Sequence, residues 1–456
     1  MVDPALNNNN IPESAPPKVM IVGAGIAGLL LGILLDKAGV PFHIYERSAT
    51  IKPLGALMSL GPNILPLLDQ IGLYKDLQEI SLPCYSFLIY SGDDEMKLLG
   101  NMGNPESEEL TGYPIAVFAR HRLYDLLLKQ IPTEKISFSQ KVVSISEDKD
   151  GVTIQTADNQ THRGDILVGA DGTYSAIRQS MYAAMEKDGV LPEADKHKMS
   201  KGFACLVGTT DPLDPAKYPG LMDPSSHSIL VLSDKTPYNW SAFTVPDGRI
   251  CWNAVLQLDE KQSQENEAKG CQWGPGTSAQ MIDEIRDFIT PYGTMGDLID
   301  ATPKDVISQV YLEDKLFETW HHGRVVLIGD GAVNAMQDAV VLANCLRDLE
   351  SSSPEAIHAC FADFREQRFA HVKEQYEASQ MNAKLIYGQT LVERALRYMV
   401  FNWMPRWVMR KGAVKNLLYR PLAMFLPLPE ARGTLERLPQ KPCKKGLVDQ
   451  RQTSVV

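Results

Sequence analysis

Hydrophobic residues near the start of the chain follow a pattern that alternates between strand and helix. Residues 18–22 form a short apolar run, residues 26–38 carry apolar residues at helical spacing, and residues 42–45 are apolar again. Gly39 and Pro41 stand where the helix would end, since glycine favours a helix C-cap and proline cannot continue a helix. The pattern predicts strand, helix, strand, the βαβ unit with which a doubly wound parallel sheet begins.

Further along, runs of strand length and of helix length occupy separate regions. Strand-like runs separated by Asp, Asn and Gly end with one over 161–168, residues 200–312 are rich in short strand-like pieces, and two helical runs cover 332–349 and 354–387. We predict an α/β fold: a doubly wound Rossmann-like domain, an inserted, mainly antiparallel β domain, and a helical C-terminal tail. The predicted boundaries are 18–80, 112–185 and 305–350 for the discontinuous Rossmann-like domain, 81–111 and 186–304 for the inserted domain, 351–456 for the helical C-terminal region, and 1–17 for a flexible leader.

Composition narrows the class of protein. The chain has 456 residues, of which 44% are hydrophobic and 22% charged, which excludes a disulfide scaffold, a collagen-like fibre and a fully disordered chain. A net charge of −11 supplies no overall field that attracts nucleic acid. The seven cysteines include no C-x-x-C pair, so neither a zinc site nor a redox dithiol is predicted, and we expect reduced, buried thiols. The polar leader lacks the features of a secretory signal, and we expect a cytoplasmic protein.

A glycine motif follows the first predicted strand and opens the first predicted helix. Gly23, Gly25 and Gly28 form G-x-G-x-x-G, in which the first glycine permits a tight turn, the second lets a pyrophosphate approach the backbone, and the third lets helix and strand pack closely. The helix N-terminus then offers free amides to the phosphates. Glu46 ends the second strand, where a carboxylate accepts hydrogen bonds from an adenosine ribose. Together these residues predict a dinucleotide site, for NAD or FAD.

Two later strands also end in glycine and aspartate. Residues 167–172 close one strand at Asp171, and residues 326–330 close another at Asp330. Ligands of open parallel sheets bind beyond the carboxyl ends of the strands, so both acids are expected along one extended cofactor. Arg120 precedes a predicted helix and is placed to act as a cation near the cofactor phosphates.

With these residues in place, the sequence resembles the FAD-dependent, NAD(P)H-using single-component monooxygenases of the aromatic hydroxylase type, especially their fungal secondary-metabolism branch. The resemblance spans residues 18 to about 347, in the family's order. Its motifs are Gly23, Gly25 and Gly28 with Glu46; Gly55-Ala56 before Gly61-Pro62-Asn63; Arg120-x-x-Leu123; Gly169-Ala170-Asp171-Gly172 with Ser175 and Arg178; Gly329-Asp330; and Gly331-Ala332-Val333-Asn334 with Gln337-Asp338-Ala339.

The resemblance implies that the first domain binds FAD, that NAD(P)H is a transient co-substrate, and that O₂ supplies an oxygen atom which hydroxylates or epoxidises a hydrophobic or aromatic small molecule in the second domain. It implies that Glu46 binds the adenosine ribose and that Arg120 binds the pyrophosphate region. It also implies that Asp330 binds the ribityl or pyrophosphate segment and that Ala332 contacts the pyrimidine edge of the flavin. Asp171 would lie where FAD meets the nicotinamide, and Gly55, Ala56 and Gly331 complete the predicted cofactor set. No protein acid or base is required, so none is assigned. A flavin dehydrogenase of the same fold and a non-catalytic, FAD-poor variant are the alternatives.

The segment after Asp330 departs from the family pattern. The family has a longer loop there, which ends in Gly-x-Gly before the helix, whereas here Gly331-Ala332-Val333-Asn334 follows at once. Two adjacent residues reach only about 7 Å, too little for Asp330 and Ala332 to make both family contacts without rearrangement. Three explanations are open: a splice or gene-model deletion, a paralogue with weakened catalysis, or a changed mode of FAD binding. We expect a retained fold with reduced or lost activity.

The C-terminal tail combines cations with aromatic residues. No acid occurs between Glu393 and Glu430. This composition suits a helix lying on an anionic membrane, and it equally suits helices that pack back on the two domains with their basic faces in solvent. Residues 394–429 are therefore a candidate for peripheral membrane contact. The basic residues are Arg394, Arg397, Arg406, Arg410, Lys411, Lys415 and Arg420, and the aromatic ones are Tyr398, Phe401, Trp403, Trp407, Tyr419 and Phe425.

Overall fold

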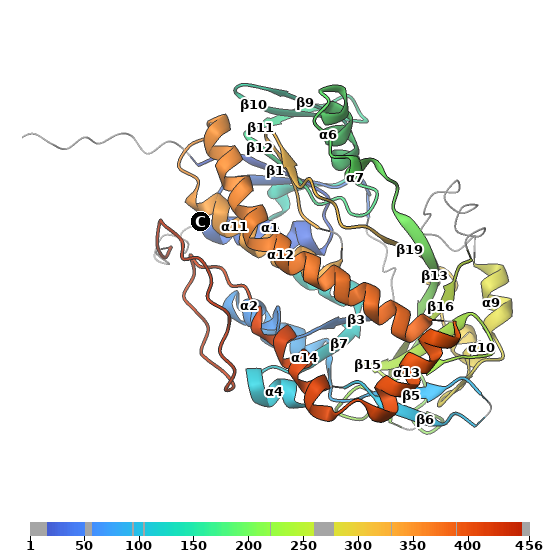
Figure 1. The fold of residues 1–456 in the computed structure, drawn as a ribbon. Coiled ribbons are helices and arrows are strands. Elements are labelled where there is room, and N and C mark those ends of the chain that lie inside the picture. Colours follow the sequence, from blue (N-terminus) through green and yellow to red (C-terminus); the bar gives the residue numbers. More distant parts are fainter. Residues whose placement is uncertain are drawn as a thin grey trace, which may run out of the picture.

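A computed structural model describes residues 16–50, 57–93, 95–103, 105–218, 220–259, 278–329, 331–388 and 390–448. Two sheet-containing bodies lie on either side of the long helix α12 (Pro354–Tyr387), as Figure 1 shows. Among the described residues, no helix combines the length and the apolar character needed to cross a bilayer.

The first body is built on a six-stranded sheet in the order β20-β21-β12-β1-β2-β8. Neighbouring strands are parallel except for β20, and Val19 of β1 pairs with both Ile166 of β12 and Phe42 of β2. This confirms the doubly wound α/β sheet. The strands are β1 (Val19–Val22), β2 (Phe42–Tyr45), β8 (Ile136–Ser137), β12 (Ile166–Gly169), β20 (His321–His322) and β21 (Val325–Leu327).

Helices pack on one face of this sheet and a small antiparallel sheet packs on the other. Helix α1 (Ile26–Ala38) is buried almost all round because it lies between the parallel sheet and α11 (Ala332–Asp348). It ends at Gly39, whose φ of 69° is the left-handed C-cap expected from the sequence. The opposite face meets β9 (Val142–Asp148), β10 (Gly151–Thr156) and α6 (Ala176–Lys187) through a shared apolar cluster, and β11 (Thr161–Gly164) pairs with β10.

The second body is a seven-stranded sheet in the order β19-β13-β16-β15-β14-β5-β6, antiparallel except between β14 and β5. Helices α9 (Ala279–Ile285) and α10 (Met295–Asp300) cover its outer face, where Trp240 and Trp252 are buried. The mainly antiparallel inserted sheet is therefore confirmed, while the predicted domain boundaries stay predictions. Its strands are β5 (Phe87–Ser91), β6 (Leu98–Asn101), β13 (Ser200–Thr209), β14 (Ser228–Leu232), β15 (Tyr238–Val245), β16 (Arg249–Gln257) and β19 (Ser308–Asp314).

Smaller elements join the two bodies. A three-stranded sheet in the order β3-β7-β4 lies against the inner face of the large sheet through an apolar cluster that includes Val117 and Phe243. Its strands are β3 (Leu57–Leu60), β4 (Leu82–Cys84) and β7 (Ile115–Ala119). The remaining elements before α12 are α2 (Leu65–Gln70), α3 (Tyr74–Glu79), α4 (Glu106–Thr111), α5 (Arg120–Leu128), η1 (Thr133–Lys135), α7 (Glu193–Lys196), β17 (Ile289–Thr290) and β18 (Gly293–Thr294).

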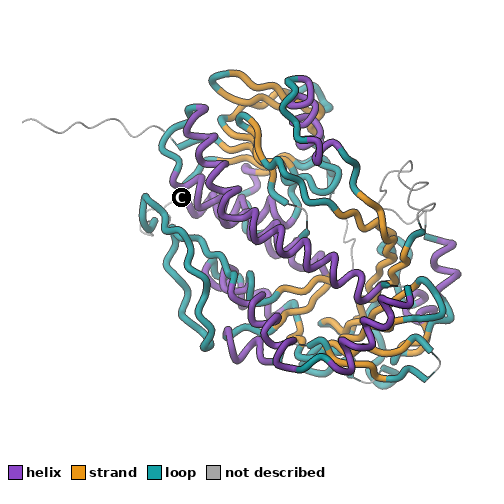
Figure 2. Tube along the Cα trace, viewed as in Figure 1, coloured by secondary structure: helices purple, strands orange, loops and turns teal. Residues whose placement is uncertain are grey.

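The C-terminal region returns to the first body. After α13 (Leu391–Trp403) and α14 (Arg406–Leu418), residues 419–448 contain no helix or strand and run back as an extended strap (Figure 2). Leu422 and Phe425 of the strap are fully buried. The Asn344 amide of α11 donates to the Leu422 carbonyl at 2.9 Å and accepts from the Met424 amide at 2.8 Å. The predicted helical C-terminal region, 351–456, is therefore confirmed for the helices between residues 354 and 418, but it also included the strap, which contains no helix.

Candidate cofactor site and active site

The glycine loop between β1 and α1 has the geometry of a dinucleotide site. Gly23 has a φ of +105°, and a Cβ there would lie 2.4 Å from the Ala170 carbonyl oxygen. A Cβ on Gly28 would lie 2.0 Å from the Gly23 oxygen, so only glycine fits at either position. A Cβ on Gly25 would meet none of the described residues within 4 Å, and Gly25 caps α1 without a side-chain bond. The start of α1 therefore presents its amides to open space.

Glu46 holds the glycine loop to the end of β2. Its side chain is almost buried; Oε2 accepts from the Ala24 amide and Oε1 from the Ser48 amide, each at 2.8 Å. An ionised carboxylate offers about four acceptor sites, so two remain after these bonds. The position and the free acceptor capacity fit the hydroxyls of an adenosine ribose.

Asp171 makes local contacts. Its Oδ1 accepts from the Ser175 hydroxyl at 2.6 Å, and its Oδ2 accepts from the Ala176 amide at 2.7 Å. The carboxylate thus satisfies free amides at the start of α6 and shapes the turn after β12. A contact between Asp171 and FAD stays a prediction. Arg178, from the same motif, donates to the Thr173 carbonyl at 2.6 Å within that turn.

The remaining predicted cofactor residues begin helices or precede them. Arg120 is the first residue of α5, where its side chain is exposed. Gly331 has a φ of +104°, a backbone conformation that favours glycine, and Ala332 begins α11 directly after it. Strand β21 ends at Leu327, so the connection to α11 is short, as the sequence predicts. Three predicted cofactor residues, Gly55, Ala56 and Asp330, lie outside the described residues.

A buried ion pair anchors this connection, and it was not predicted. Asp338 on α11 accepts from the Gly329 amide at 2.8 Å through Oδ2, and from Arg368 Nε on α12 at 2.6 Å through Oδ1. Arg368 is fully buried. The neighbouring Gln337 donates to the Asn63 carbonyl at 3.1 Å, which ties α11 to the segment before α2. Asp338 thus holds the end of β21 to α11 and α12. The sequence shows the motif but not this pairing, because Arg368 lies 30 residues away.

A cavity of about 500 Å³ opens at the carboxyl ends of β12 and β21, between the parallel sheet, the edge strand β19 and α12. This is where an open parallel sheet binds its ligands. The cavity brings together the glycines that end both strands with side chains of the second body. Its lining includes Gly169, Gly172, Arg178, Val310, Phe317, Gly329, Gly331, Asn334 and Gln375.

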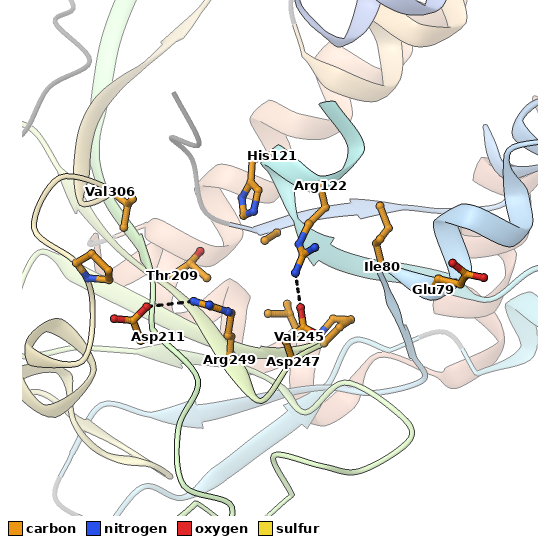
Figure 3. A pocket seen from close by; sticks show the side chains of 13 residues that line it. Glu79, Ile80, His121, Arg122, Thr209, Asp211, Val245, Asp247, Arg249 and Val306 are labelled. Carbon is orange, nitrogen blue, oxygen red and sulfur yellow. Dashed lines mark hydrogen bonds and ion pairs between the residues drawn. The ribbon is translucent and has the colours of Figure 1, made fainter. Parts of the chain in front are cut away.

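A second cavity of about 310 Å³ lies where the start of α5 meets the second sheet (Figure 3). Arg249 lies 3.4 Å from Asp211, and Arg122 of α5 forms an ion pair with Asp247 of the β15–β16 turn. Burial and the nearby Arg122 lower the pKa of His121, so this imidazole is neutral at physiological pH. The Arg122 ion pair links the two bodies across the cavity.

These features fit FAD. The glycine loop leaves space where a pyrophosphate would approach, Glu46 keeps acceptor capacity, and the 500 Å³ cavity continues from the same edge of the sheet. A single extended dinucleotide cofactor accounts for all three features.

Comparisons with known proteins agree. The family model described as FAD binding domain matches residues 17–200. The FAD-dependent monooxygenase prhF of Penicillium brasilianum is 26% identical to this chain over 450 residues, which cover 94% of this chain and 91% of that protein. The FAD-dependent monooxygenase paxM of Penicillium paxilli is 28% identical over 451 residues, covering 92% of this chain and 89% of that protein.

The chain carries an FAD-binding domain over residues 17–200 and is similar over nearly its whole length to FAD-dependent monooxygenases. It is an oxidoreductase, and FAD is its cofactor. Solved structures show the same fold. Klebsiella pneumoniae HpxO, solved with FAD and uric acid, superposes with a TM-score of 0.72 at 21% identity, covering 91% of this chain and 99% of that one. A salicylate hydroxylase substrate complex superposes with a TM-score of 0.61 at 20% identity, and the match covers 90% of this chain and 100% of that one.

Proposed function

We propose that this monooxygenase binds FAD along Gly23, Gly25, Gly28 and Glu46 and uses NAD(P)H and O₂ to hydroxylate or epoxidise a hydrophobic or aromatic small molecule. The observation that carries the proposal is the placement of the 500 Å³ cavity: it lies at the ligand-binding edge of the cofactor sheet and faces the second sheet across β19. The HpxO structure, which shares this fold, contains uric acid, so the fold accommodates a small ring compound beside FAD.

The protein contributes binding, orientation and exclusion of water. The amides at the start of α1 hold the pyrophosphate, and Glu46 accepts hydrogen bonds from the ribose. Bound FAD would supply the redox chemistry that the side chains lack, namely acceptance of a hydride from NAD(P)H and activation of O₂. The apolar residues between the two bodies keep water from the reacting centre, which suppresses unproductive consumption of reduced cofactor. No side chain is assigned as a general acid or base.

We further propose that the short connection between β21 and α11 lowers activity without disrupting the fold. Asp338 and Arg368 still anchor Gly329, so the strand end keeps its support. The four residues 328–331, in contrast, leave little chain to surround a flavin ring. Sequencing the transcript separates a gene-model deletion from a connection that is short in the protein itself.

The visible absorbance spectrum of the purified protein tests these proposals. If the short connection between β21 and α11 lowers activity, the purified protein should contain less than one FAD per chain and should show little substrate-stimulated NADPH oxidation. Stoichiometric FAD with strong substrate-stimulated oxidation would show that activity is intact. Incorporation of ¹⁸O from labelled O₂ into product distinguishes a monooxygenase from a flavin dehydrogenase, and a protein that binds no added FAD would be the non-catalytic variant.

We also propose that the tail contacts a membrane. The exposed apolar residues of α13 and α14 support this proposal better than the basic residues on which the sequence-based prediction relied. Most of its cations have partners within the protein: Arg397 pairs with Asp234 at 2.6 Å, and Arg410 pairs with Glu106 at 2.6 Å. Arg394 and Lys415 also have acidic partners, and Arg420 donates to the Leu435 carbonyl. The basic residues therefore supply less membrane attraction than the composition indicated.

Several apolar residues of α13 and one at the start of α14 face outward instead. Leu391 is 84% exposed, Trp403 70% and Trp407 69%. Tryptophan and leucine on an exposed helix favour a lipid interface. We expect the protein to co-sediment with phosphatidylserine-containing vesicles and a Trp403→Ser, Trp407→Ser variant to lose most of this binding. The exposed Leu447, changed to Ser, is the matched control; equal binding of all three proteins would exclude the contact.

A further inference from the structure

Three polar side chains form a row across the inner face of the seven-stranded sheet, the face turned toward β3, β7 and the end of α12. Ser308 of β19 pairs with Val207 of β13, Val207 pairs with Asn253 of β16, and Asn253 pairs with Ser241 of β15. Residues directly opposite one another on antiparallel strands point to the same face. Ser241, Asn253 and Ser308, called the polar row below, therefore share the inner face.

Two polar groups at and beside this row have no hydrogen-bond partner among the described residues. Ser308 is fully buried, and its hydroxyl is one of the two. Asn239 lies two residues before Ser241 on β15 and so on the same face; its buried Nδ2 is the other, although its Oδ1 accepts from the Ser233 amide at 2.9 Å. Buried polar atoms in folded proteins are nearly always hydrogen-bonded, so two unsatisfied groups on the two outer strands of this row, β19 and β15, leave room for a bound partner between them.

Apolar residues border the polar row on both sides. On one side, Cys205 and Val255 pack with Tyr387 at the end of α12, which Figure 1 shows passing over this part of the sheet. On the other side, Phe243 and Cys251 pack with residues of β7 and β4. The inner face is thus an apolar surface with a band of hydrogen-bonding groups along its middle. Such a surface recognises a largely hydrophobic molecule that carries a polar group at one position.

The surroundings of the polar row disfavour an anion. Burial raises the pKa of the Cys205 and Cys251 thiols to about 12, which shows how poorly this face solvates negative charge. The cation Arg249 lies at the far end of the face, opposite Val245, where it donates to the Thr210 carbonyl at 2.8 Å and lies 3.4 Å from Asp211. A carboxylate bound at the row would lose its hydration without gaining Arg249 as a partner.

We propose that Ser241, Asn253 and Ser308 recognise an uncharged hydroxyl or carbonyl group of a hydrophobic substrate, and that they exclude carboxylate-bearing analogues. The inference rests on the proposed monooxygenase function and names its substrate class; Val310, which lines the 500 Å³ cavity, lies two residues from Ser308 on the same face of β19. The asparagine amide and both hydroxyls can each donate and accept, so they suit an alcohol, a phenol or a ketone. Recognition by buried polar groups discriminates strongly, because a ligand without the matching group leaves them unpaired.

Equilibrium dialysis of the full chain with excess FAD tests the proposal, with 2-naphthol, 2-naphthoate and naphthalene as probes. We expect 2-naphthol to bind at least tenfold more tightly than 2-naphthoate. Asn253→Leu should weaken 2-naphthol at least tenfold and leave naphthalene within twofold, because the apolar borders stay. Equal or tighter binding of 2-naphthoate, no binding of any probe, or parallel losses for 2-naphthol and naphthalene would each overturn the proposal.

Ser308→Ala gives a second test that does not depend on whether Asn253→Leu folds. Removal of this unsatisfied buried hydroxyl should leave the thermal midpoint unchanged or higher, yet weaken 2-naphthol several-fold. A purely structural serine would show the opposite, a lower midpoint with unchanged binding. Ser146→Ala, on an exposed strand of the first body, is the matched control. Oxygen transfer is measured separately: selective binding without oxygenation would contradict the proposed function while supporting the polar row.

Discussion

Arg368 Nε donates to Asp338 Oδ1 at 2.6 Å, and both side chains are almost completely excluded from solvent. The second carboxylate oxygen accepts from the Gly329 amide, so one ion pair joins α12, α11 and the end of β21. Open parallel sheets bind their ligands at such strand ends, which is where we propose that FAD binds. The pair therefore connects the helix between the two bodies with the cofactor site.

Removal of either partner should strongly destabilise the protein. Arg368→Met or Asp338→Asn leaves an uncompensated buried group, which typically lowers the free energy of unfolding by about 3–5 kcal/mol. Urea unfolding followed by circular dichroism measures the loss. The double variant should lose less than the sum of the two single losses, because the partners act as a unit. The exposed pair of Arg163 and Asp148 is the control, and Arg163→Met should leave the midpoint unchanged. Equal effects at both sites would refute the role given to the buried pair.

Two glycines of the cofactor loop should respond differently to a methyl group. Gly25→Ala meets no atom of the described residues within 4 Å, so the thermal midpoint should stay the same while FAD affinity falls at least about tenfold, or ~1.4 kcal/mol, because the methyl stands where the pyrophosphate approaches. Gly28→Ala would place its Cβ 2.0 Å from the Gly23 oxygen, so the midpoint should fall as well. Differential scanning fluorimetry and fluorescence titration with FAD measure both. Unchanged FAD affinity in Gly25→Ala would place the pyrophosphate elsewhere.

Stability should decrease in mild acid through His371. Burial and the nearby Arg368 lower the pKa of His371 to about 4, from an ordinary 6.5. Between these values the unfolded chain binds more protons than the folded one, so the contribution is complete above pH 6.5 and is lost as pH falls toward 4. After a reduction for partial exposure, the effect is about 1 kcal/mol. Urea midpoints at pH 7.5 and 5.0 should therefore differ more for the natural protein than for His371→Gln. An identical difference in both proteins would rule out this histidine.

Local sequence patterns predicted the parts of the fold that local chemistry determines. The glycine loop, the α1 helix and its Gly39 cap follow from residues within a few positions of one another. The strand-like run over 161–168 was predicted as one element but divides into β11 and β12. The division falls at Asp165, whose carboxylate accepts from the Lys18 amide at 2.7 Å, so β12 turns into the parallel sheet. Periodicity cannot show such a contact, because its partner is 147 residues away.

The missed parts of the site depend on pairing between distant residues. Arg368 is one of two arginines in α12, and nothing in its sequence neighbourhood distinguishes it from Arg365 as buried. The polar row exists only through strand register, since Ser241, Asn253 and Ser308 belong to three strands. The charge of residues 394–429 was visible in the sequence, but its partners were not: most of the cations bind acidic or carbonyl groups of the protein, while Trp403 and Trp407 are exposed.

The strap over residues 419–448 should be essential to the first body, although it contains no regular structure. Phe425 is fully buried in the same cluster as α1 and α11, and Phe-to-Ala changes in such positions lower stability by about 3–5 kcal/mol. Phe425→Ala should lose that amount in urea unfolding. Leu447→Ala, at an exposed position of the strap, should lose almost nothing. A small loss in both variants would mean that the strap only covers the surface. A large loss confined to Phe425 would show that the end of the chain completes the core beneath the cofactor sheet.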